Sequence, residues 1–359
     1  MPWNDLYGTA RNLSHGIMYP VVAVQTKFIP IRLGWCYNGR KLRRYWLGGP
    51  FSVFALLVRL YRSQLRSNRK LILHVHSPIF GALSWVIKAM CPSMIIVCNL
   101  HNEWSGFRVW QRLSLRMLVN ISSATICVSE SISKTIPSRV RHNLLKNQRL
   151  KAIRNGIRSG DLENDYPVQR LTTNRTADVV VVARMVPQKN VFFVLRCFSK
   201  LKGARNLVWF GDGLQREELK KYALELGVDQ RVQWCGVQPR IRVFDALSAS
   251  SVYLACSKWE GIGVANLEAA ALGCQPFLSD ISPHREIAEI LCLETLPLDD
   301  ENTWVKAIDV YLSLKVDERN VNAATLAQKT RTAFDLNNSV MAYMDVYREV
   351  VELALRRGS

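Results

Sequence analysis

Apolar residues occur along the chain in short continuous runs, separated by longer stretches in which they recur at helical spacing. In the first half, four runs have the length and composition of strands: Val21–Val24, Leu71–Val75, Ile95–Val97 and Ala124–Val128. Continuous apolar runs of this kind are typical of strands that are buried on both faces. Three helical patterns lie between successive runs: Phe51–Arg66 before Leu71–Val75, Ile79–Ala89 before Ile95–Val97, and Val109–Asn120 before Ala124–Val128. The alternation predicts parallel sheets covered by helices.

The same alternation returns between Asp178 and about Glu294, with strands expected at Val179–Val182, Val208–Phe210 and Ser251–Cys256. Residues 158–176 are polar and contain Pro167, so we place a linker there. We therefore predict an α/β protein of two Rossmann-like domains, residues 1–165 and 171–338. The remaining segment, 339–359, contains an amphipathic helix at Val340–Leu355.

One apolar stretch is long enough to suggest a membrane span. Residues 79–100 contain a single charge, Lys88. The stretch is interrupted by Cys91-Pro92-Ser93 and ends in the β-prone run Met94–Cys98. A helix, a turn and a buried parallel strand explain it better than a transmembrane helix.

Composition supports a folded protein in a reducing compartment. The 359 residues suffice for two domains, and 48% of them are hydrophobic. Nine cysteines are scattered without a Cys-X-X-Cys pair, which argues against a disulfide framework and a zinc site. No amino-terminal signal segment is visible, so we expect a cytoplasmic protein.

The net charge of +19 is distributed unequally along the chain. Residues 1–170 carry 25 Lys and Arg against 6 Asp and Glu, whereas residues 171–359 carry 23 of each kind. A basic half of this kind indicates an anionic partner: membrane lipid, nucleic acid or an acidic substrate.

Three segments of the second half combine a strand with residues suited to an anionic ligand. The first strand is followed by a loop with Arg184 and Lys189-Asn190, and the second by Gly211-Asp212-Gly213. The third leads into Glu260-Gly261-Ile262-Gly263 and a helix that carries Glu268. Glycines let the backbone approach a ligand, and a helix start offers unpaired N–H groups to an anion. Each segment alone could equally be an ordinary βα turn with solvated charges.

Taken together and in this order, the segments resemble the retaining glycosyltransferases of family 4. That resemblance implies a GT-B fold, in which two Rossmann-like domains face a central cleft and a C-terminal helix crosses back to the N-terminal domain. It also implies that Arg184 and Lys189 bind the donor diphosphate and that Glu268 binds the ribose hydroxyls. Glu260, with the backbone of Gly261, Ile262 and Gly263, would face the sugar and phosphates, and Gly211 and Gly213 would border the donor.

The resemblance extends to His101, which directly follows a strand in Asn99-Leu100-His101. In the family a histidine at this place lies against the sugar hydroxyls, so His101 joins Arg184, Lys189 and Glu260 as a candidate catalytic residue. Family enzymes usually need no metal, and the sequence contains no Asp-X-Asp motif. We therefore expect no metal and no cofactor besides the nucleotide-sugar donor. His74 and His76 alternate on one strand and are interpreted as core or cleft-lining residues.

The amino terminus departs from the family pattern. The segment Met1–Leu6 is short and polar, where relatives begin with an apolar strand and a glycine-rich loop. The first strand is apparently missing, and Gly8 is a candidate remnant of the loop. This departure favours an alternative hypothesis, a catalytically inactive subunit of a glycan-synthesis complex.

The basic half also contains helices suited to a membrane surface. Arg108, Arg112 and Arg116 recur every fourth residue beside Trp110 and Leu113. Arg59, Arg62 and Arg66 recur at helical spacing in an earlier expected helix. Helices of this type can lie in a lipid interface, although any amphipathic surface helix shows a similar pattern.

The resulting hypothesis is a peripheral enzyme on the inner face of the plasma membrane. It would transfer a sugar from a nucleoside diphosphate-sugar, with retention, to a lipid-linked or glycan acceptor in surface polysaccharide or lipopolysaccharide biosynthesis. A basic nucleic-acid-binding protein is a further alternative, but no RNA- or DNA-binding motif supports it.

Overall fold

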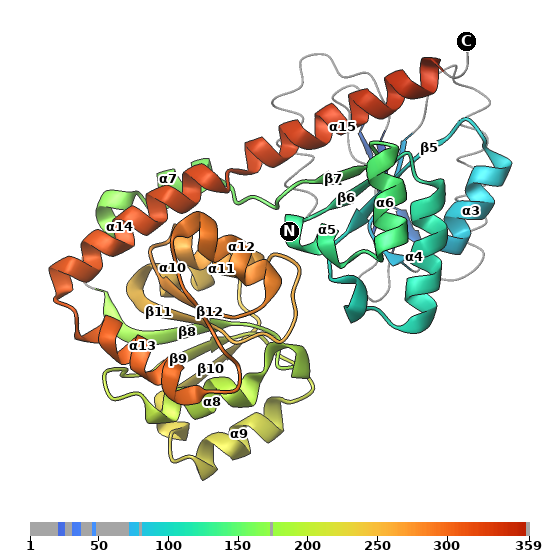
Figure 1. Cartoon of the computed structure of the whole chain (residues 1–359). Coiled ribbons are helices and arrows are strands. Elements are labelled where there is room, and N and C mark those ends of the chain that lie inside the picture. Colours follow the sequence, from blue (N-terminus) through green and yellow to red (C-terminus); the bar gives the residue numbers. More distant parts are fainter. Residues whose placement is uncertain are drawn as a thin grey trace. The chain divides into compact units, whose positions relative to one another are not determined.

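The computed structural model describes residues 21–25, 31–36, 45–47, 72–78, 81–172 and 175–356. The chain divides into two compact units, Met1–Arg154 with Asn337–Ser359, and Asn155–Leu336. Figure 1 labels many of the elements of both units. The expected helix at Phe51–Arg66 and Gly8 lie outside the described residues, as does the segment in which the first strand was judged missing.

The first unit contains a sheet of seven strands. Their bounds are β1 Val21–Gln25, β2 Ile31–Cys36, β3 Tyr45–Leu47, β4 Ile72–Val75, β5 Ile95–Leu100, β6 Ala124–Cys127 and β7 Leu150–Ala152. The strand order is β3-β2-β1-β4-β5-β6-β7. The neighbouring strands in the series β1-β4-β5-β6-β7 are parallel to one another, as the alternation of strands and helices predicted.

One edge of this sheet is antiparallel, which the sequence pattern did not indicate. Strand β2 pairs in antiparallel fashion with both β1 and β3. Only residues 26–30 separate β1 from β2, whereas a parallel crossover needs about a dozen residues or more. The short connection therefore requires the antiparallel pairing.

Strands β4 and β5 alternate their side chains between two faces of the sheet. Leu73, Val75, Ile96 and Cys98 belong to a core shared with the helices of one face. Those helices are α3 Gly81–Met90, α4 Val109–Ile121, α5 Glu130–Thr135 and α6 Ser138–Lys146, with the short η2 Trp104–Gly106 before α4.

The last helix, α15 Leu336–Arg356, belongs almost entirely to this first unit. Its Tyr343 and Tyr347 are buried, and their hydroxyls contact polar side chains of β5 and β4. An ion pair of 2.8 Å joins Lys151 of β7 to Glu349 of the helix. The chain thus returns to the N-terminal unit at its end, as expected.

The second unit contains six parallel strands: β8 Thr176–Val182, β9 Leu207–Phe210, β10 Val232–Gly236, β11 Ser250–Ala255, β12 Gln275–Ser279 and β13 Thr295–Leu296. Their order is β10-β9-β8-β11-β12-β13. The chain builds one side of the sheet outward from β8 and then returns to build the other side from β11. The point of reversal therefore lies between β8 and β11.

Helices cover both faces of this sheet, as Figure 1 shows. One core lies under α8 Val191–Lys200, α9 Arg216–Glu225 and α13 Glu301–Ser313. The other lies under α10 Arg240–Ala249, α11 Val264–Ala271, α12 Ser282–Leu291 and α14 Val316–Ala333. Because both faces are buried, the strands read as continuous apolar runs, which is why they were recognisable.

The chain passes between the units earlier than the polar composition of 158–176 indicated. Much of that segment instead folds in the second unit, as α7 Ser159–Asp165 and η3 Val168–Thr172. Arg331 of α14 donates hydrogen bonds to backbone carbonyls of Tyr166 and Ala271, and so holds the segment in place. The chain is closely packed just after it enters the second unit, since a Cβ atom on Gly156 would lie 2.6 Å from the Cα of Leu336.

Candidate functional site

The loops that follow β8 and β11 contain most of the residues predicted to bind a donor. In a parallel sheet the carboxyl ends of the strands lie along one edge, and ligands bind where the strand order reverses. Here that reversal lies between β8 and β11. The two loops are joined by hydrogen bonds of 2.8 and 2.9 Å, from the Gln188 amide to the Trp259 carbonyl and from the Lys258 N–H to the Gln188 carbonyl.

An ion pair connects the same two loops. Lys189 ends the short helix η4 Pro187–Lys189, and its Nζ lies 2.7 Å from Oε1 of Glu260. The Glu260 side chain is only 6% exposed and that of Lys189 20% exposed. Two of the predicted residues, 71 positions apart in the sequence, are thus brought together at the expected place.

Further polar groups surround Glu260. The Ser257 hydroxyl donates a hydrogen bond to Oε1, and Nε2 of His284 lies 3.8 Å from the same oxygen. Burial by itself raises the pKa of Glu260, but His284 and Lys189 stabilise the carboxylate more strongly and hold its pKa well below the ordinary value. Glu260 is therefore ionised at neutral pH and is a poor proton acceptor.

Arg184 lies on the β8 loop and is exposed, with its guanidinium 3.4 Å from the Gln188 amide oxygen. This exposed position leaves the Arg184 guanidinium accessible to a ligand that binds at the loop. The structure does not bring Arg184 into contact with Glu260 or Glu268 among the interactions of the described residues.

Gly211 and Gly213 have a packing reason to be glycines. A Cβ on Gly211 would lie 2.1 Å from the Ala183 carbonyl oxygen, and one on Gly213 would lie 2.3 Å from that of Met185. Gly211 also has a φ of +124°, which L side chains rarely adopt. These glycines allow the β9 loop to pack directly against the β8 loop that carries Arg184. Their role as donor-binding residues stays a prediction.

The glycine loop after β11 packs against Glu260. Gly263 has a φ of +70°, and a Cβ there would lie 2.6 Å from Oε2 of Glu260. Ile262 is buried in the core, so only its backbone and that of Gly261 can approach a ligand. Gly263 directly precedes α11, whose first turn carries unpaired N–H groups suited to an anion.

Glu268 lies on α11 and pairs with Arg240 of α10 at 2.7 Å. The side chain of Glu268 is 15% exposed, and the side chain of Arg240 is 43% exposed. Glu260 pairs with Lys189 and Glu268 with Arg240, so the two carboxylates have different cationic partners.

His101 belongs to the other unit, at the carboxyl end of β5. Its Nε2 lies 3.1 Å from Nδ1 of His76, which in turn lies 3.3 Å from the Asn99 amide nitrogen. Asn99 donates to the Tyr343 hydroxyl at 2.9 Å, and His74 contacts Tyr347 at 2.6 Å. Burial lowers the pKa of His101 to about 4 and that of His74 to about 3, so both rings are neutral at pH 7. His74 and His76 are both buried, which agrees with their interpretation as core or cleft-lining residues.

The sequence interpretation overlooked a buried polar cluster behind Glu260. It consists of Ser257, Asn266, Ser279 and His284. A serine at the end of a strand and a histidine in the first turn of the next helix are common, so they carry little signal by themselves. What could have drawn attention is that both follow β12, whose carboxyl end shares the edge of the predicted site.

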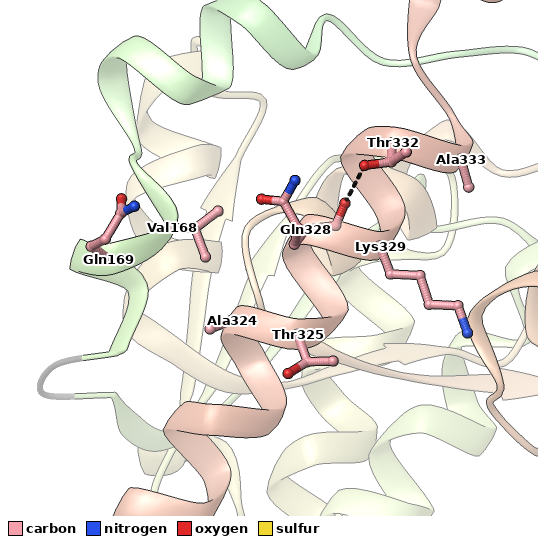
Figure 2. A pocket seen from close by; sticks show the side chains of 8 residues that line it. All are labelled: Val168, Gln169, Ala324, Thr325, Gln328, Lys329, Thr332 and Ala333. Atoms are coloured by element: carbon pink, nitrogen blue, oxygen red, sulfur yellow. Dashed lines mark hydrogen bonds between the residues drawn. The ribbon is translucent and has the colours of Figure 1, made fainter.

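The cavity in Figure 2 lies elsewhere in the second unit. It has a volume of about 720 Å³ and lies between η3 and α14, with Val168, Gln328 and Lys329 among its lining residues. None of the predicted site residues lines it. Within the described segments, no cluster of three or more His, Cys, Asp or Glu is arranged to hold a metal ion.

Comparison with known proteins identifies the family. A model described as glycosyltransferase family 4 matches residues 23–159, and one described as glycosyl transferases group 1 matches residues 165–291. The chain is 25% identical over 310 residues to EpsF of Bacillus subtilis, named as a candidate glycosyltransferase, covering 81% of this chain and 78% of that protein. It is 23% identical over 324 residues to the Escherichia coli UDP-Gal:alpha-D-GlcNAc-diphosphoundecaprenol alpha-1,3-galactosyltransferase, covering 82% and 79%.

The solved structures agree on the fold. HepE of Anabaena, crystallised with UDP and glucose, superimposes with a TM-score of 0.67 at 14% identity, and 82% of each chain is covered. Its fold matches in both units, although the sequences have diverged widely. The two family models together span more than two thirds of the chain, and the protein therefore belongs to the family 4 glycosyltransferases of GT-B fold.

Proposed function

We propose that the protein transfers a sugar from a nucleoside diphosphate-sugar, with retention of anomeric configuration, to a lipid-linked or glycan acceptor. The observation that carries this proposal is the Lys189–Glu260 pair at the reversal point of the second sheet. The E. coli relative is named for a UDP-sugar donor and a diphosphoundecaprenol acceptor, and HepE was crystallised with UDP and glucose. Both support a donor and an acceptor of these classes.

In this proposal the β8 loop binds the donor diphosphate. Negative charge develops on the leaving phosphate as the glycosidic bond breaks, and fixed cations stabilise it best where water is partly excluded. Arg184 and Lys189 supply two such cations on one loop. We assign to them the charge stabilisation that a divalent metal provides in other transferases, so that no metal or further cofactor is needed.

Glu260 and Glu268 receive binding roles. A carboxylate with a depressed pKa is a poor general base, so Glu260 accepts hydrogen bonds from sugar hydroxyls and is not a proton acceptor. Glu268 accepts two hydrogen bonds from the ribose diol. Retention then follows a front-face route, in which the leaving phosphate takes the acceptor proton and no side-chain nucleophile takes part. His101 contributes as a neutral hydrogen-bonding group near the sugar.

The test is a screen of nucleotide-sugars for hydrolysis or transfer in the presence of membrane extract. Lys189→Ala and Glu268→Ala should each abolish turnover of the donor that is found. Lys258→Ala is the matched control, because this exposed lysine lies on the neighbouring loop and has no role in the proposal. Near-normal turnover by Lys189→Ala would refute the site.

We propose that the first unit binds an anionic membrane surface. That unit carries 26 Lys and Arg against 6 Asp and Glu, and the second unit carries 22 against 23. On α4, Val109, Trp110 and Leu113 are 74%, 52% and 63% exposed, and Arg108, Arg112 and Arg116 recur along the same helix. An exposed apolar stripe flanked by arginines suits the interface of an anionic bilayer.

Within the described part of the chain, no helix has the length and hydropathy to cross a membrane. The cysteines from Cys91 to Cys292 are free thiols, which fits a reducing compartment. The thiols and the exposed apolar stripe of α4 with its arginines support a protein peripheral to the cytoplasmic face of the plasma membrane. The diphosphoundecaprenol acceptor for which the E. coli relative is named supports a role in the biosynthesis of surface polysaccharide or lipopolysaccharide.

Co-sedimentation with vesicles tests the membrane proposal. Binding to vesicles with phosphatidylglycerol should exceed binding to pure phosphatidylcholine, and each of Arg112→Ala and Arg116→Ala should weaken it about fivefold, because a cation at the surface contributes about 1 kcal/mol. Trp110→Ser should weaken binding further. Leu224→Ser, an equally exposed apolar position in the second unit, is the control. Equal binding to both kinds of vesicle would contradict the proposal.

A further inference from the structure

His284 occupies an unusual place for a histidine that has no direct part in the proposed chemistry. It lies in the first turn of α12, at the carboxyl edge of the second sheet, and is completely buried. A leucine would fill such a core position at less cost, because a buried polar ring must have its hydrogen bonds satisfied. The ring must therefore be judged by what its two nitrogens contact.

The contacts define the protonation of the ring. Nδ1 lies 3.1 Å from the carbonyl oxygen and 3.0 Å from the hydroxyl of Ser279. The Ser279 hydroxyl already donates its own proton to the Ser257 carbonyl at 2.6 Å. Both oxygens are therefore acceptors toward the ring, and Nδ1 carries a hydrogen. Nε2 lies 2.9 Å from the Asn266 amide nitrogen.

Through these bonds His284 connects four segments that meet behind Glu260. Ser279 ends β12, Ser257 follows β11, Asn266 lies on α11 and the ring itself belongs to α12. Ser257 also donates to the Glu260 carboxylate, and Nε2 lies 3.8 Å from the same carboxylate oxygen. The cluster thus contacts the same carboxylate that pairs with Lys189 at 2.7 Å.

We propose that His284 is a positioning residue for sugar transfer: its ring holds Ser279, Ser257 and Asn266 in place, and they hold the Glu260 carboxylate and its Lys189 partner in the productive orientation. The inference rests on the proposed function, in which Glu260 binds the sugar and Lys189 the diphosphate. The ring itself touches neither ligand. Loss of the ring should therefore affect the turnover step more than donor affinity.

Three variants separate positioning from simple packing. His284→Leu keeps an apolar filling but removes both hydrogen-bonding nitrogens. His284→Gln restores a hydrogen-bonding group at the place of Nε2. Ile287→Ala is the matched control, because Ile287 is also completely buried on α12 but belongs to the apolar core. All three are compared per folded molecule, with kcat and the donor KM measured separately.

We expect His284→Leu to lower kcat on the order of a hundredfold, as misplacement of a catalytic group by about 1 Å does, with little change in KM. His284→Gln should recover most of the loss, and Ile287→Ala should lower the melting temperature without lowering kcat. In a Glu260→Gln background, His284→Leu should cost less than about threefold, because coupled residues are not additive. Full additivity, or an equal loss in Ile287→Ala, would overturn the inference.

A second measurement needs no donor. Hydrogen exchange in the free protein should be faster in His284→Leu for peptides covering residues 256–263 and unchanged for those covering 210–225. If the wild-type protein turns over no nucleotide-sugar, the proposed function fails, whereas this measurement still judges the positioning role. Unchanged exchange at 256–263 would overturn the positioning role. This measurement also decides the question if His284→Leu is too unstable for kinetics and only His284→Gln can be assayed.

Discussion

The two units share an architecture but place their charges in opposite ways. The first unit has a large excess of basic residues, yet the polar cluster at its β4 and β5 strands is neutral: His74, His76, Asn99 and the tyrosines of α15. The second unit is almost neutral overall, yet it buries the Lys189–Glu260 ion pair between two strand loops. Net charge therefore indicates what a surface attracts, and it says little about the chemistry at the end of the strands.

The largest expected effect follows from removing one partner of the buried pair. Lys189→Met should lower the free energy of unfolding by about 3 kcal/mol, because it leaves a buried carboxylate without its cation. In the first unit, Lys151→Met breaks the Lys151–Glu349 pair, whose side chains are 31% and 38% exposed, and should cost less than about 1 kcal/mol. Chemical denaturation of both variants measures the contrast.

The double variant Lys189→Met/Glu260→Gln serves as the control for this comparison. Removing both charges should restore much of the lost stability, because no unpaired charge is left buried. It should restore none of the activity, because the lysine that binds the diphosphate is missing. Equal losses in Lys189→Met and Lys151→Met would show that the two ion pairs are alike, and would end the distinction between the units.

The acid range should separate the units next. Burial, followed by the charge of His101, lowers the pKa of His74 to about 3 from 6.5, so protonation below pH 6.5 favours the unfolded chain. The stability that neutral His74 contributes is complete above pH 6.5 and falls by about 2 kcal/mol at pH 5. The pKa of Glu260 is lowered instead, so its contribution is complete above about pH 4.5 and is lost only below it.

Hydrogen exchange at pH 7.5 and pH 5, corrected for intrinsic rates, checks this difference. Peptides from β4 and β5 should lose protection at pH 5, and peptides from β8 and β11 should lose less. His74→Gln should remove the part of this loss of protection that is due to His74. Replacing the exposed His142 by Gln should leave the loss unchanged. A uniform loss of protection in both units would contradict the assignment of the neutral cluster to the first.

Much of the architecture followed from the sequence because strands buried on both faces leave continuous apolar runs. The runs at Val179–Val182 and Ile95–Val97 correspond to β8 and β5. The antiparallel strand β2 was not foreseen, since its pairing depends on the length of the preceding connection. The passage between the units was misplaced because polar composition is shared by linkers and by surface elements such as α7, which is anchored here by Arg331.

The candidate site was likewise predictable from the sequence only in part. Lys189 and Glu260 were recognisable from the residues around them, but their direct pairing across 71 positions depends on which strands are neighbours. His284 was overlooked for a related reason. Its contacts with Ser279 and Asn266 exist only once β12, α11 and α12 have packed together.

The smallest expected effect concerns the second ion pair of the same unit. Arg240 lies 2.7 Å from Glu268, but its side chain is 43% exposed and its guanidinium also stacks on Phe244 at 4.7 Å. Exposed pairs of this kind contribute about 1 kcal/mol or less, so Arg240→Ala should change the free energy of unfolding by no more than that. Thermal denaturation of Arg240→Ala beside Lys189→Met measures both pairs under one condition.

A small effect at Arg240 matters for the proposed role of Glu268. A carboxylate that binds a ribose diol must exchange its protein partner for the ligand at little cost, and a weak, half-exposed partner permits this. Glu260 differs, because it is buried itself and its half-buried partner Lys189 stays in place and keeps it ionised. If Arg240→Ala destabilised the protein as strongly as Lys189→Met, Glu268 would be part of the structural framework, and the binding of the nucleoside would have to be assigned to other residues of the loops around β8 and β11.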